Sequence, residues 1–213
     1  ELNRRKIISI DFQHGMQSGS IPIFKYNDDI TSEQKKYIPQ YTFIFGEFWR
    51  KKYNYCKNVV AVGNLYHEKM SEIVSNIRKE ENSILIVSDG LLARDKLIKL
   101  AISISKNLIG IKIYYKLRPE EYKNASIDYK LLYEQKNIQV ISSDESYLYE
   151  FIKKSNYVIG INSTVLIESN RFSNIIVYKT EWSFEMNDFT NSGNFLLADN
   201  PRAVEEIIKN KIE

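Results

Sequence analysis

Short apolar runs alternate with amphipathic stretches along most of the chain, from about residue 84 to its end. A short apolar run between polar residues predicts a buried strand, and apolar side chains at helical spacing predict a helix that covers it. Repeated strand–helix units predict an α/β fold with a parallel, doubly wound sheet that helices cover on both faces. The predicted strands are 84–87, 111–115, 139–141, 157–161, 175–178 and 195–198, and the predicted helices are 92–105, 127–135, one capped by Asp144, a short one after Thr164 and a last one beginning at Asn200-Pro201.

Residues 1–65 follow a different pattern, with predicted strands at 7–10, 41–45 and 59–62 and long polar connections between them. Three strands without covering helices do not form a stable α/β domain. We therefore interpret 1–65 as the tail of a preceding domain or as an added layer, and 66–213 as the main domain. A stripe of apolar residues at helical spacing, expected to bridge to the main domain, consists of Met70, Ile73, Val74 and Ile77.

Composition narrows the class of protein. Of the 213 residues, 43% are hydrophobic and 27% are charged, as in ordinary soluble globular proteins. The net charge of +3 suits an anionic small ligand or a weak attraction to acidic lipid, but it does not indicate nucleic-acid binding. The single cysteine, Cys56, excludes an internal disulfide and favours a reducing compartment. With two histidines beside that cysteine, no structural zinc site of the usual kind is possible.

These properties lead to an expectation about location. No run approaches the roughly 20 apolar residues of a membrane span, and no secretion signal opens the chain. We therefore expect a cytoplasmic protein without a metal or a cofactor, whose contact with the inner face of the membrane would be peripheral.

Ligands of open parallel sheets bind beyond the carboxyl ends of the strands. That rule selects four polar loops of this sequence, 88–91, 116–122, 142–144 and 162–164. Neither G-x-G-x-x-G nor G-x-x-x-x-G-K-[ST] occurs, which argues against a dinucleotide dehydrogenase and against a P-loop ATPase. The candidate ligand-binding residues are Ser88, Asp89, Gly90, Lys116, Arg118, Glu120, Asn162, Ser163, Thr164 and Glu168.

The Asn162-Ser163-Thr164 turn joins a predicted buried strand to a helix. Backbone N–H groups and hydroxyls at a helix N-terminus suit a phosphate, because unpaired donors and the positive end of the dipole meet there. Glu168, five residues after Ser163, is placed to accept hydrogen bonds from ribose hydroxyls. The alternative is simple capping by Ser163 or Thr164, with Glu168 as an acid favoured by the dipole.

Lys116 and Arg118 place two cations on the same side of an extended segment before a proline. Two such groups neutralise a diphosphate, and arginine offers it a bidentate fork. Ion pairing with Glu120 and Glu121 is the alternative.

His14 follows the first predicted strand, in Gln13-His14-Gly15. A loop histidine can donate to a phosphate or serve as an acid or base near neutral pH, although a structural role is the alternative. The aromatic loop 181–186 is interpreted either as a lid over a base or sugar or as a segment that only packs.

In this order, the motifs resemble those of GT-B-fold bacterial glycosyltransferases that build cell-surface polysaccharides. The similarity is to the capsule, lipopolysaccharide and sialyltransferase-like group, with CDP-glycerol polymerases further away. It spans nearly the whole chain, although each motif is short. The matching segments are 11–15, 45–49 and 60–64, then Lys116, Arg118-Pro119 and Glu120, and finally Asn162-Ser163-Thr164 with Glu168.

The resemblance implies two facing Rossmann-like domains, with 1–65 as the tail of the acceptor-side domain and 66–213 as the C-terminal nucleotide-sugar-binding domain. It implies transfer of a sugar from a CMP-, UDP- or GDP-linked donor to a polysaccharide or lipopolysaccharide acceptor, without a metal. The ten candidates would bind the donor, and His14 would face the cleft and assist the phosphate or the acceptor. Arg118 stands where the family has histidine, which retains the charge but puts proton transfer at this position in doubt.

Two other functions remain open at this point. A sugar-nucleotide 2-epimerase shares the two-domain architecture, but it needs more acids and a histidine in the cleft. A non-catalytic nucleotide-sugar-binding lobe would accommodate both Arg118 and the short first segment.

Overall fold

The computed structural model describes residues 5, 7–16, 33–53, 56–90, 93–143 and 148–210. The chain forms two compact units, Glu1–Lys69 and Met70–Glu213. The cap predicted at Asp144, the start predicted for the helix at 92 and the last residue of the loop 88–91 lie outside the described residues.

The second unit is built on a six-stranded sheet in which every neighbouring pair is parallel. Its strand order is β6-β5-β4-β7-β8-β9. The strands β5 and β6, added after β4, lie on one side of it, and β7 and the strands after it lie on the other, so the strand order reverses between β4 and β7. This confirms the predicted α/β fold with a doubly wound sheet. The strands are β4 Ser83–Val87, β5 Lys112–Lys116, β6 Ile138–Ile141, β7 Tyr157–Gly160, β8 Asn174–Tyr178 and β9 Leu196–Ala198.

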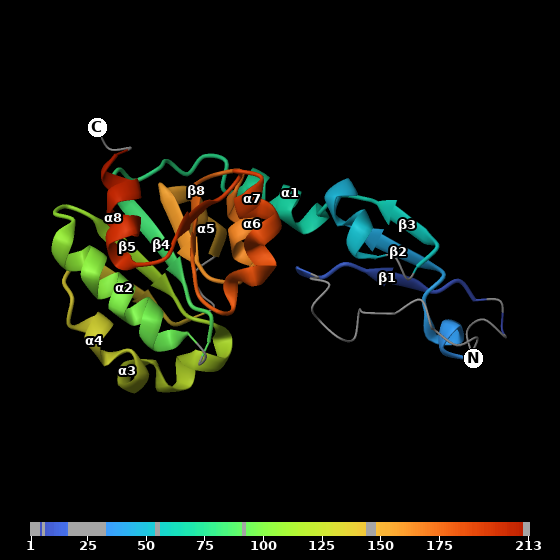
Figure 1. Ribbon diagram of the computed structural model, residues 1–213, viewed down its shortest axis with the longest axis horizontal. Coiled ribbons are helices and arrows are strands. Elements are labelled where there is room, and N and C mark those ends of the chain that lie inside the picture. Colours follow the sequence, from blue (N-terminus) through green and yellow to red (C-terminus); the bar gives the residue numbers. More distant parts are fainter. Residues whose placement is uncertain are drawn as a thin grey trace. The chain divides into compact units, whose positions relative to one another are not determined.

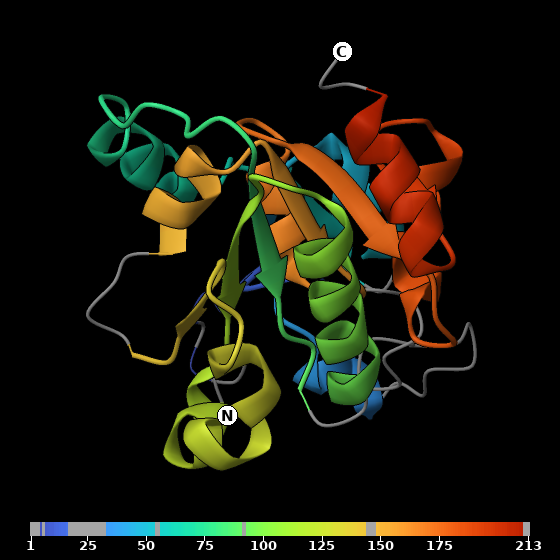
Figure 2. The same cartoon turned by 90° about the vertical axis from the view of Figure 1, so that its left-hand side faces the viewer.

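Helices cover both faces of this sheet, as Figures 1 and 2 show. On one face, α2 (Arg94–Asn107) and α8 (Pro201–Lys209) pack into a core with alternate strand residues such as Ile84 and Ile86. On the other face, α5 (Leu148–Lys154) packs against Tyr114, whose ring centroid lies 4.9 Å from that of Phe151. Because both faces are covered, all of β4 is buried, as its continuous apolar run predicts.

The last helix begins where the sequence predicts. Asn200 is extended, and its side chain accepts a hydrogen bond of 3.0 Å from the Ala203 N–H. Pro201 occupies the first helical position, where no N–H is needed. Val204 and Ile208 are fully buried, so the predicted face of this helix is the one that contacts the core.

The single helix predicted at 127–135 is wrong. Two short helices occupy this segment instead, α3 Ala125–Asp128 and α4 Lys130–Tyr133, and the 3-10 helix η4 Pro119–Asn124 precedes them. Tyr129 interrupts them in a non-helical conformation, and its side chain is buried in the core. Tertiary packing of this tyrosine therefore overrides the helical period. The remaining short elements are α6 Thr164–Ser169, η5 Ser183–Met186 and α7 Asn187–Asn191.

The first unit contains a three-stranded parallel sheet in the order β1-β2-β3. The strand predicted at 7–10 is wrong, because pairing with the neighbouring strand begins at Ile10, which lies opposite Tyr41. The Ser9 carbonyl still accepts the Tyr41 N–H at 3.1 Å, but the Ser9 N–H and hydroxyl bind Gln40. The elements are β1 Ile10–Phe12, β2 Tyr41–Ile44, β3 Asn58–Ala61, η2 Gln34–Tyr37 and η3 Glu47–Lys52.

One face of this small sheet is buried and the other is exposed. Thr42 and Ile44 are fully buried on one face. On the other face, Ile10, Phe12 and Val60 share a side because they occupy alternating and paired positions, and each is more than a third exposed.

The helix α1 (Leu65–Ile73) lies where the division between the two units falls. Met70 and Val74 are buried and pack with Tyr149, as the predicted stripe requires. The prediction is wrong for Ile73, which is largely exposed, and the helix ends there, before Val74 and Ile77.

Candidate functional site

The loops that follow β4, β5 and β7 meet at one edge of the six-stranded sheet, which we call the carboxyl edge. They are 88–90, 116–122 and 162–164, all within the second unit. The strand order reverses between β4 and β7, and ligand sites of open α/β sheets occur at such a reversal. The topology therefore brings these three predicted loops to one edge, and the described part of the fourth, 142–143, follows β6 at the same edge.

Gly160 determines how closely the two central strands pack at this edge. A Cβ atom there would lie 3.0 Å from Val87 Cγ2 and 3.2 Å from Leu166 Cδ2. Those distances are shorter than ordinary packing allows, so the end of β7 lies tightly against β4 and α6. The loops that follow β4 and β7 consequently start from adjacent, closely packed positions.

A buried polar network connects the loop after β4 to the loop after β5. The hydroxyl of Ser88 donates to Glu121 Oε1 at 2.9 Å, and Tyr129 donates to the same oxygen. The other carboxylate oxygen of Glu121 accepts a hydrogen bond of 2.7 Å from the backbone N–H of Arg118. Glu121 therefore fixes the backbone from which the Arg118 side chain projects.

Arg118 and Asp89 form an ion pair across these two loops. The distance from Arg118 Nη2 to Asp89 Oδ1 is 3.1 Å, and the aspartate side chain is 10% exposed whereas the arginine side chain is 42% exposed. Burial raises the pKa of Asp89 to about 6, against the opposing effect of Arg118 and with a further increase from Glu185 and Glu121. Arg118 Nη1 also lies 3.8 Å from Glu120, so the predicted ion pairing is present, although weak and exposed.

Lys116 contacts an aromatic side chain of the same loop. Its Nζ donates to the Tyr122 hydroxyl, lies 4.7 Å from the centroid of that ring, and is 3.4 Å from the carbonyl oxygen of Ser143. Leu117 between the two cations is buried. Lys116 and Arg118 therefore project to the same side, as the extended segment predicts.

The Asn162-Ser163-Thr164 turn has the geometry of a helix cap. Ser163 is extended, and its hydroxyl accepts from the Val165 N–H at 3.3 Å, which realises the capping alternative. Asn162 Oδ1 is buried and has no hydrogen-bond partner within the described ranges. Burial raises the pKa of Glu168, and a hydrogen bond from Tyr149 opposes that shift.

His14 belongs to the first unit, whereas the ten donor candidates belong to the second. Its side chain is exposed in the turn after β1. The neighbouring Gln13 is buried, accepts a hydrogen bond of 2.8 Å from the Phe45 N–H and donates one of 3.0 Å to the Gly15 carbonyl. Gln13 therefore stabilises the turn that presents His14, a role that the sequence analysis missed.

The aromatic loop after β8 is tied to α2 by an ion pair of 2.5 Å between Lys96 and Glu181. Trp182 and Phe184 are each at least 40% exposed, whereas Met186 is fully buried. This loop therefore presents two aromatic rings to solvent, and its role as a lid stays a prediction.

Tyr129 is a site residue that the sequence analysis missed, and Glu121 was considered there only as an ion-pair partner of the two cations. Glu121 stands three residues after Arg118, the spacing of a capping box, and that was the available signal. Tyr129 carried no such signal, because its partner becomes visible only in the fold. Within the described part of the chain, no group of three or more metal-ligating side chains occurs, and no helix has the length and apolarity needed to cross a membrane.

No protein-family model matches the sequence, and no curated protein matches it significantly. Solved structures do match. A UDP-GlcNAc 2-epimerase from Neisseria meningitidis bound to UDP-GlcNAc is 14% identical, with 99% of this chain and 63% of that chain covered and a TM-score of 0.67. The S. aureus protein MnaA solved with UDP is 15% identical, with 100% and 61% covered and a TM-score of 0.67.

The wall teichoic acid polymerase TagF is a more distant match. It is 11% identical, with 95% of this chain and 58% of that chain covered and a TM-score of 0.52. These likenesses concern the fold, and they show that the chain has the Rossmann-like architecture of GT-B proteins. The chain spans less than two thirds of the length of each of these structures.

Proposed function

We propose that the second unit binds a nucleotide sugar at its carboxyl edge, as part of a glycosyltransferase that transfers the sugar to a cell-surface glycan. The observation that supports this most is the convergence of Lys116 and Arg118 at the strand-order reversal, beside the Ser88–Gly90 loop. Two of the similar structures were solved with UDP-GlcNAc or UDP bound, which suits a nucleotide ligand here.

In this proposal, the two cations stabilise the charge that develops on the leaving diphosphate. Arg118 exchanges its contact with Asp89 for the phosphates, and the half-exposed guanidinium is free to do so without unfolding the loop. The Ser163 turn donates to a phosphate, and Glu168 accepts from the ribose. His14 assists the phosphate or the glycan acceptor, and the reaction takes place at the cytoplasmic face of the membrane without a metal.

Calorimetry of the chain with UDP, CDP, CMP and GDP tests the binding site. We expect one of these nucleotides to bind, and Arg118→Ala to weaken it at least tenfold, since a hydrogen bond to a charged group contributes about 1.5–3 kcal/mol. Arg202→Ala, which removes the same charge from an exposed position of α8, is the matched control and should bind normally. Absence of binding by all four nucleotides, or equal loss in both variants, overturns the proposal.

Ser163 allows the phosphate role to be separated from capping. Ser163→Asp keeps a good cap but brings a negative charge to the proposed phosphate position. We expect its unfolding free energy to stay within about 0.5 kcal/mol of the parent while nucleotide affinity falls about tenfold or more. Unchanged affinity would leave Ser163 with the capping role alone.

Sugar-nucleotide 2-epimerisation is the second candidate function. The observation that favours it is the higher TM-score of the two epimerase-type matches, 0.67 against 0.52 for the polymerase. Proton NMR of UDP-N-acetylglucosamine in D2O distinguishes the two reactions. Inversion at C2 exchanges the C2 hydrogen with solvent, whereas a transferase leaves that hydrogen in place and releases UDP only with an acceptor. Binding without either reaction would instead support the non-catalytic lobe.

A further inference from the structure

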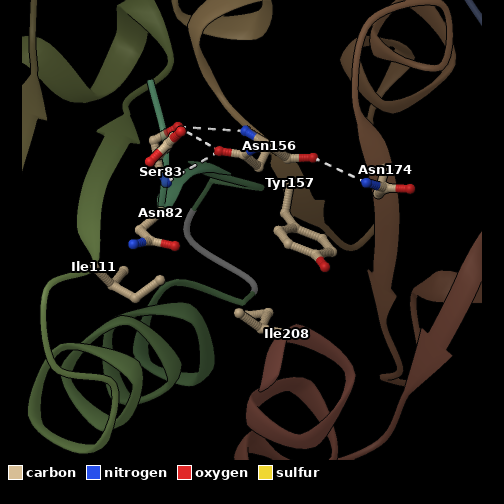
Figure 3. A pocket seen from close by; sticks show the side chains of 8 residues that line it. Asn82, Ser83, Ile111, Asn156, Tyr157, Asn174 and Ile208 are labelled. Atoms are coloured by element: carbon tan, nitrogen blue, oxygen red, sulfur yellow. Dashed lines mark hydrogen bonds between the residues drawn. The ribbon is translucent and has the colours of Figure 1, made fainter. Parts of the chain in front are cut away.

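A pocket of about 460 Å³ lies at the opposite edge of the six-stranded sheet, which we call the amino edge (Figure 3). It is far from the carboxyl edge, because β4 has five residues and a strand rises about 3.3 Å per residue, which gives roughly 16 Å. The pocket belongs entirely to the second unit. Its lining residues are Glu81, Asn82, Ser83, Ile111, Asn156, Tyr157, Asn174 and Ile208.

The walls of this pocket divide into a polar and an apolar side. Figure 3 shows the side chains of Asn82, Asn156 and Asn174 around it, with Ile111 and Ile208 on the side away from Asn156. Among the described residues that line it there is no lysine or arginine, and Glu81 is the one that carries a carboxyl group. A phosphate or carboxylate ligand would therefore find no cation here, whereas a neutral ligand meets groups that both donate and accept hydrogen bonds.

The hydrogen bonds of Asn156 leave a donor for a ligand. Its Oδ1 accepts from the backbone N–H of Ser83 at 3.3 Å and lies 3.3 Å from the Ser83 hydroxyl oxygen, which fixes the orientation of the carboxamide. For the amide nitrogen, no partner appears in the described part of the chain. Ser83 itself is fully buried and donates at 2.6 Å to the carbonyl of Glu80, so it supports Asn156 and is not a ligand contact.

Tyr157 contributes an unpaired hydroxyl to the same pocket. The residue is 4% exposed, and within the described ranges no hydrogen bond to its hydroxyl occurs. Figure 3 shows its ring extending from the end of β7 into the space between Asn156 and Ile208. Burial raises the pKa of this phenol, so it stays a neutral donor. The hydroxyl is not one of the fully buried polar atoms without a partner in the described part of the chain, so it is open to the pocket and can donate to a ligand.

We infer that the amino-edge pocket is a second ligand site, and that it takes a neutral polyhydroxylated ring, a saccharide unit without phosphate. Ring hydroxyls both donate and accept, which matches the carboxamides and the Tyr157 hydroxyl. The apolar C–H face of a sugar ring packs on Ile111 and Ile208. The volume lies within the range of about 300–1,000 Å³ typical of small-molecule pockets. This inference does not depend on the proposed nucleotide site.

The test is an NMR titration of the isotope-labelled chain with N-acetylglucosamine, glucose and lactose. We expect saturable shifts of the side-chain amide signals of Asn82, Asn156 and Asn174, with a dissociation constant in the range of about 1–10 mM for at least one sugar. The inference is overturned if none of the three sugars gives saturable shifts at these signals, or if inorganic phosphate shifts them more strongly.

Two variants connect the shifts to this pocket. Tyr157→Phe removes only the unpaired hydroxyl, and Asn82→Gly removes one carboxamide while keeping the left-handed backbone, φ 55° at this position. Each should weaken saccharide binding about fivefold, the loss expected for one hydrogen bond. Tyr133→Phe, at an exposed tyrosine of α4, is the control and should bind as the parent does. Unchanged affinity in both pocket variants would contradict the inference.

A parallel titration with UDP separates this site from the nucleotide site. CDP, CMP and GDP are titrated in the same way. We expect the nucleotide that binds to shift signals of 88–90 and 116–122 and to leave the three asparagine side chains unmoved. Failure of all four nucleotides to bind would overturn the proposed function alone, and failure of the sugars would overturn this inference alone.

Discussion

The two edges of the six-stranded sheet carry different chemistry, although the same strands end at both. At the carboxyl edge, charged groups from separate loops already pair with one another, as Arg118 does with Asp89. At the amino edge, uncharged carboxamides and the Tyr157 hydroxyl, which has no partner in the described part of the chain, line one pocket. A ligand of Arg118 at the proposed carboxyl-edge site would therefore compete with an existing contact, whereas a ligand of the Tyr157 hydroxyl would not.

This difference determines what each edge should respond to. Ion pairs depend on pH and ionic strength, so the carboxyl edge should be sensitive to both. Carboxamides and a phenol with a raised pKa do not change charge near neutral pH, so the amino edge should be insensitive. Four predictions test this difference between the two edges, from the largest expected effect to the smallest.

The largest expected effect comes from Glu121→Ala. This carboxylate accepts from Ser88, from Tyr129 and from the backbone of Arg118, so its removal leaves three buried or half-buried donors without an acceptor. We expect a loss of about 3–4 kcal/mol in the free energy of unfolding, measured by urea denaturation. Glu120→Ala, at a side chain that is 65% exposed, is the control and should change it by less than about 0.5 kcal/mol. Equal effects of the two would mean that the network contributes nothing to the fold.

Asp89→Asn should have the next largest effect, and its size should depend on pH. Because the folded pKa, about 6, lies above the usual value of 3.8, the folded state binds the proton more tightly than the unfolded chain does. Ionised Asp89 therefore costs stability that is fully present above pH 6, decreases as the pH falls towards 3.8, and is absent below it. We expect the variant to be more stable by roughly 2–3 kcal/mol at pH 8 and equal to the parent at pH 3.5. A constant difference across this range would contradict the shift.

Ser83→Ala tests whether stability at the amino edge depends on pH, and its effect should be smaller than that of Asp89→Asn. Its hydroxyl donates to the Glu80 carbonyl at 2.6 Å, with the Lys154 carbonyl at 3.0 Å as a second possible acceptor, and it accepts from the backbone N–H of Asn156. These are neutral hydrogen bonds, so we expect a loss of about 1–2 kcal/mol that does not vary between pH 5 and 8. Denaturation at both pH values measures it, with exposed Ser192→Ala as the control. A loss as large as that of Glu121→Ala would remove the contrast between the edges.

The smallest expected effect distinguishes two substitutions of Asn82. This residue has φ 55°, which asparagine and glycine tolerate better than other residues. Asn82→Gly should change the unfolding free energy by less than about 0.5 kcal/mol, because relief of strain and added freedom of the unfolded chain offset each other. Asn82→Ala should cost about 1 kcal/mol. If thermal denaturation ranks them in the opposite order, the left-handed backbone at this position is contradicted. A loss of about 1 kcal/mol or more in both variants would instead show that the carboxamide supports the fold.

The sequence was sufficient to predict the central strands and the last helix. The run that forms β4 is apolar throughout and ends at Ser88, and Asn200-Pro201 is an unambiguous start. The helix predicted at 127–135 failed because Tyr129 gains more from the core and from Glu121 than from continuing a helix. Such a preference depends on contacts that form only in the folded protein, so it cannot be predicted from the spacing of apolar residues along the chain.

For the site, the sequence predicted where the polar loops lie but not which of their side chains pair with one another. The loops follow from the strand map, because parallel strands end at a common edge. The Arg118–Asp89 pair joins residues 29 positions apart, and it depends on the register that sets Val87 opposite Lys116. The amino-edge pocket was missed for a different reason. Asn82, Asn156 and Asn174 look in the sequence like ordinary turn residues, which asparagine usually marks.

The ion pair at the carboxyl edge has a consequence for selectivity. A singly charged anion such as chloride or acetate offers the Arg118 guanidinium no more charge than the carboxylate of Asp89 already does, so it gains nothing by replacing it. A diphosphate brings at least two charges and several oxygens in the geometry of the guanidinium fork. At the proposed nucleotide site, we therefore expect the Asp89 carboxylate to favour a diphosphate over common monoanions without any steric barrier.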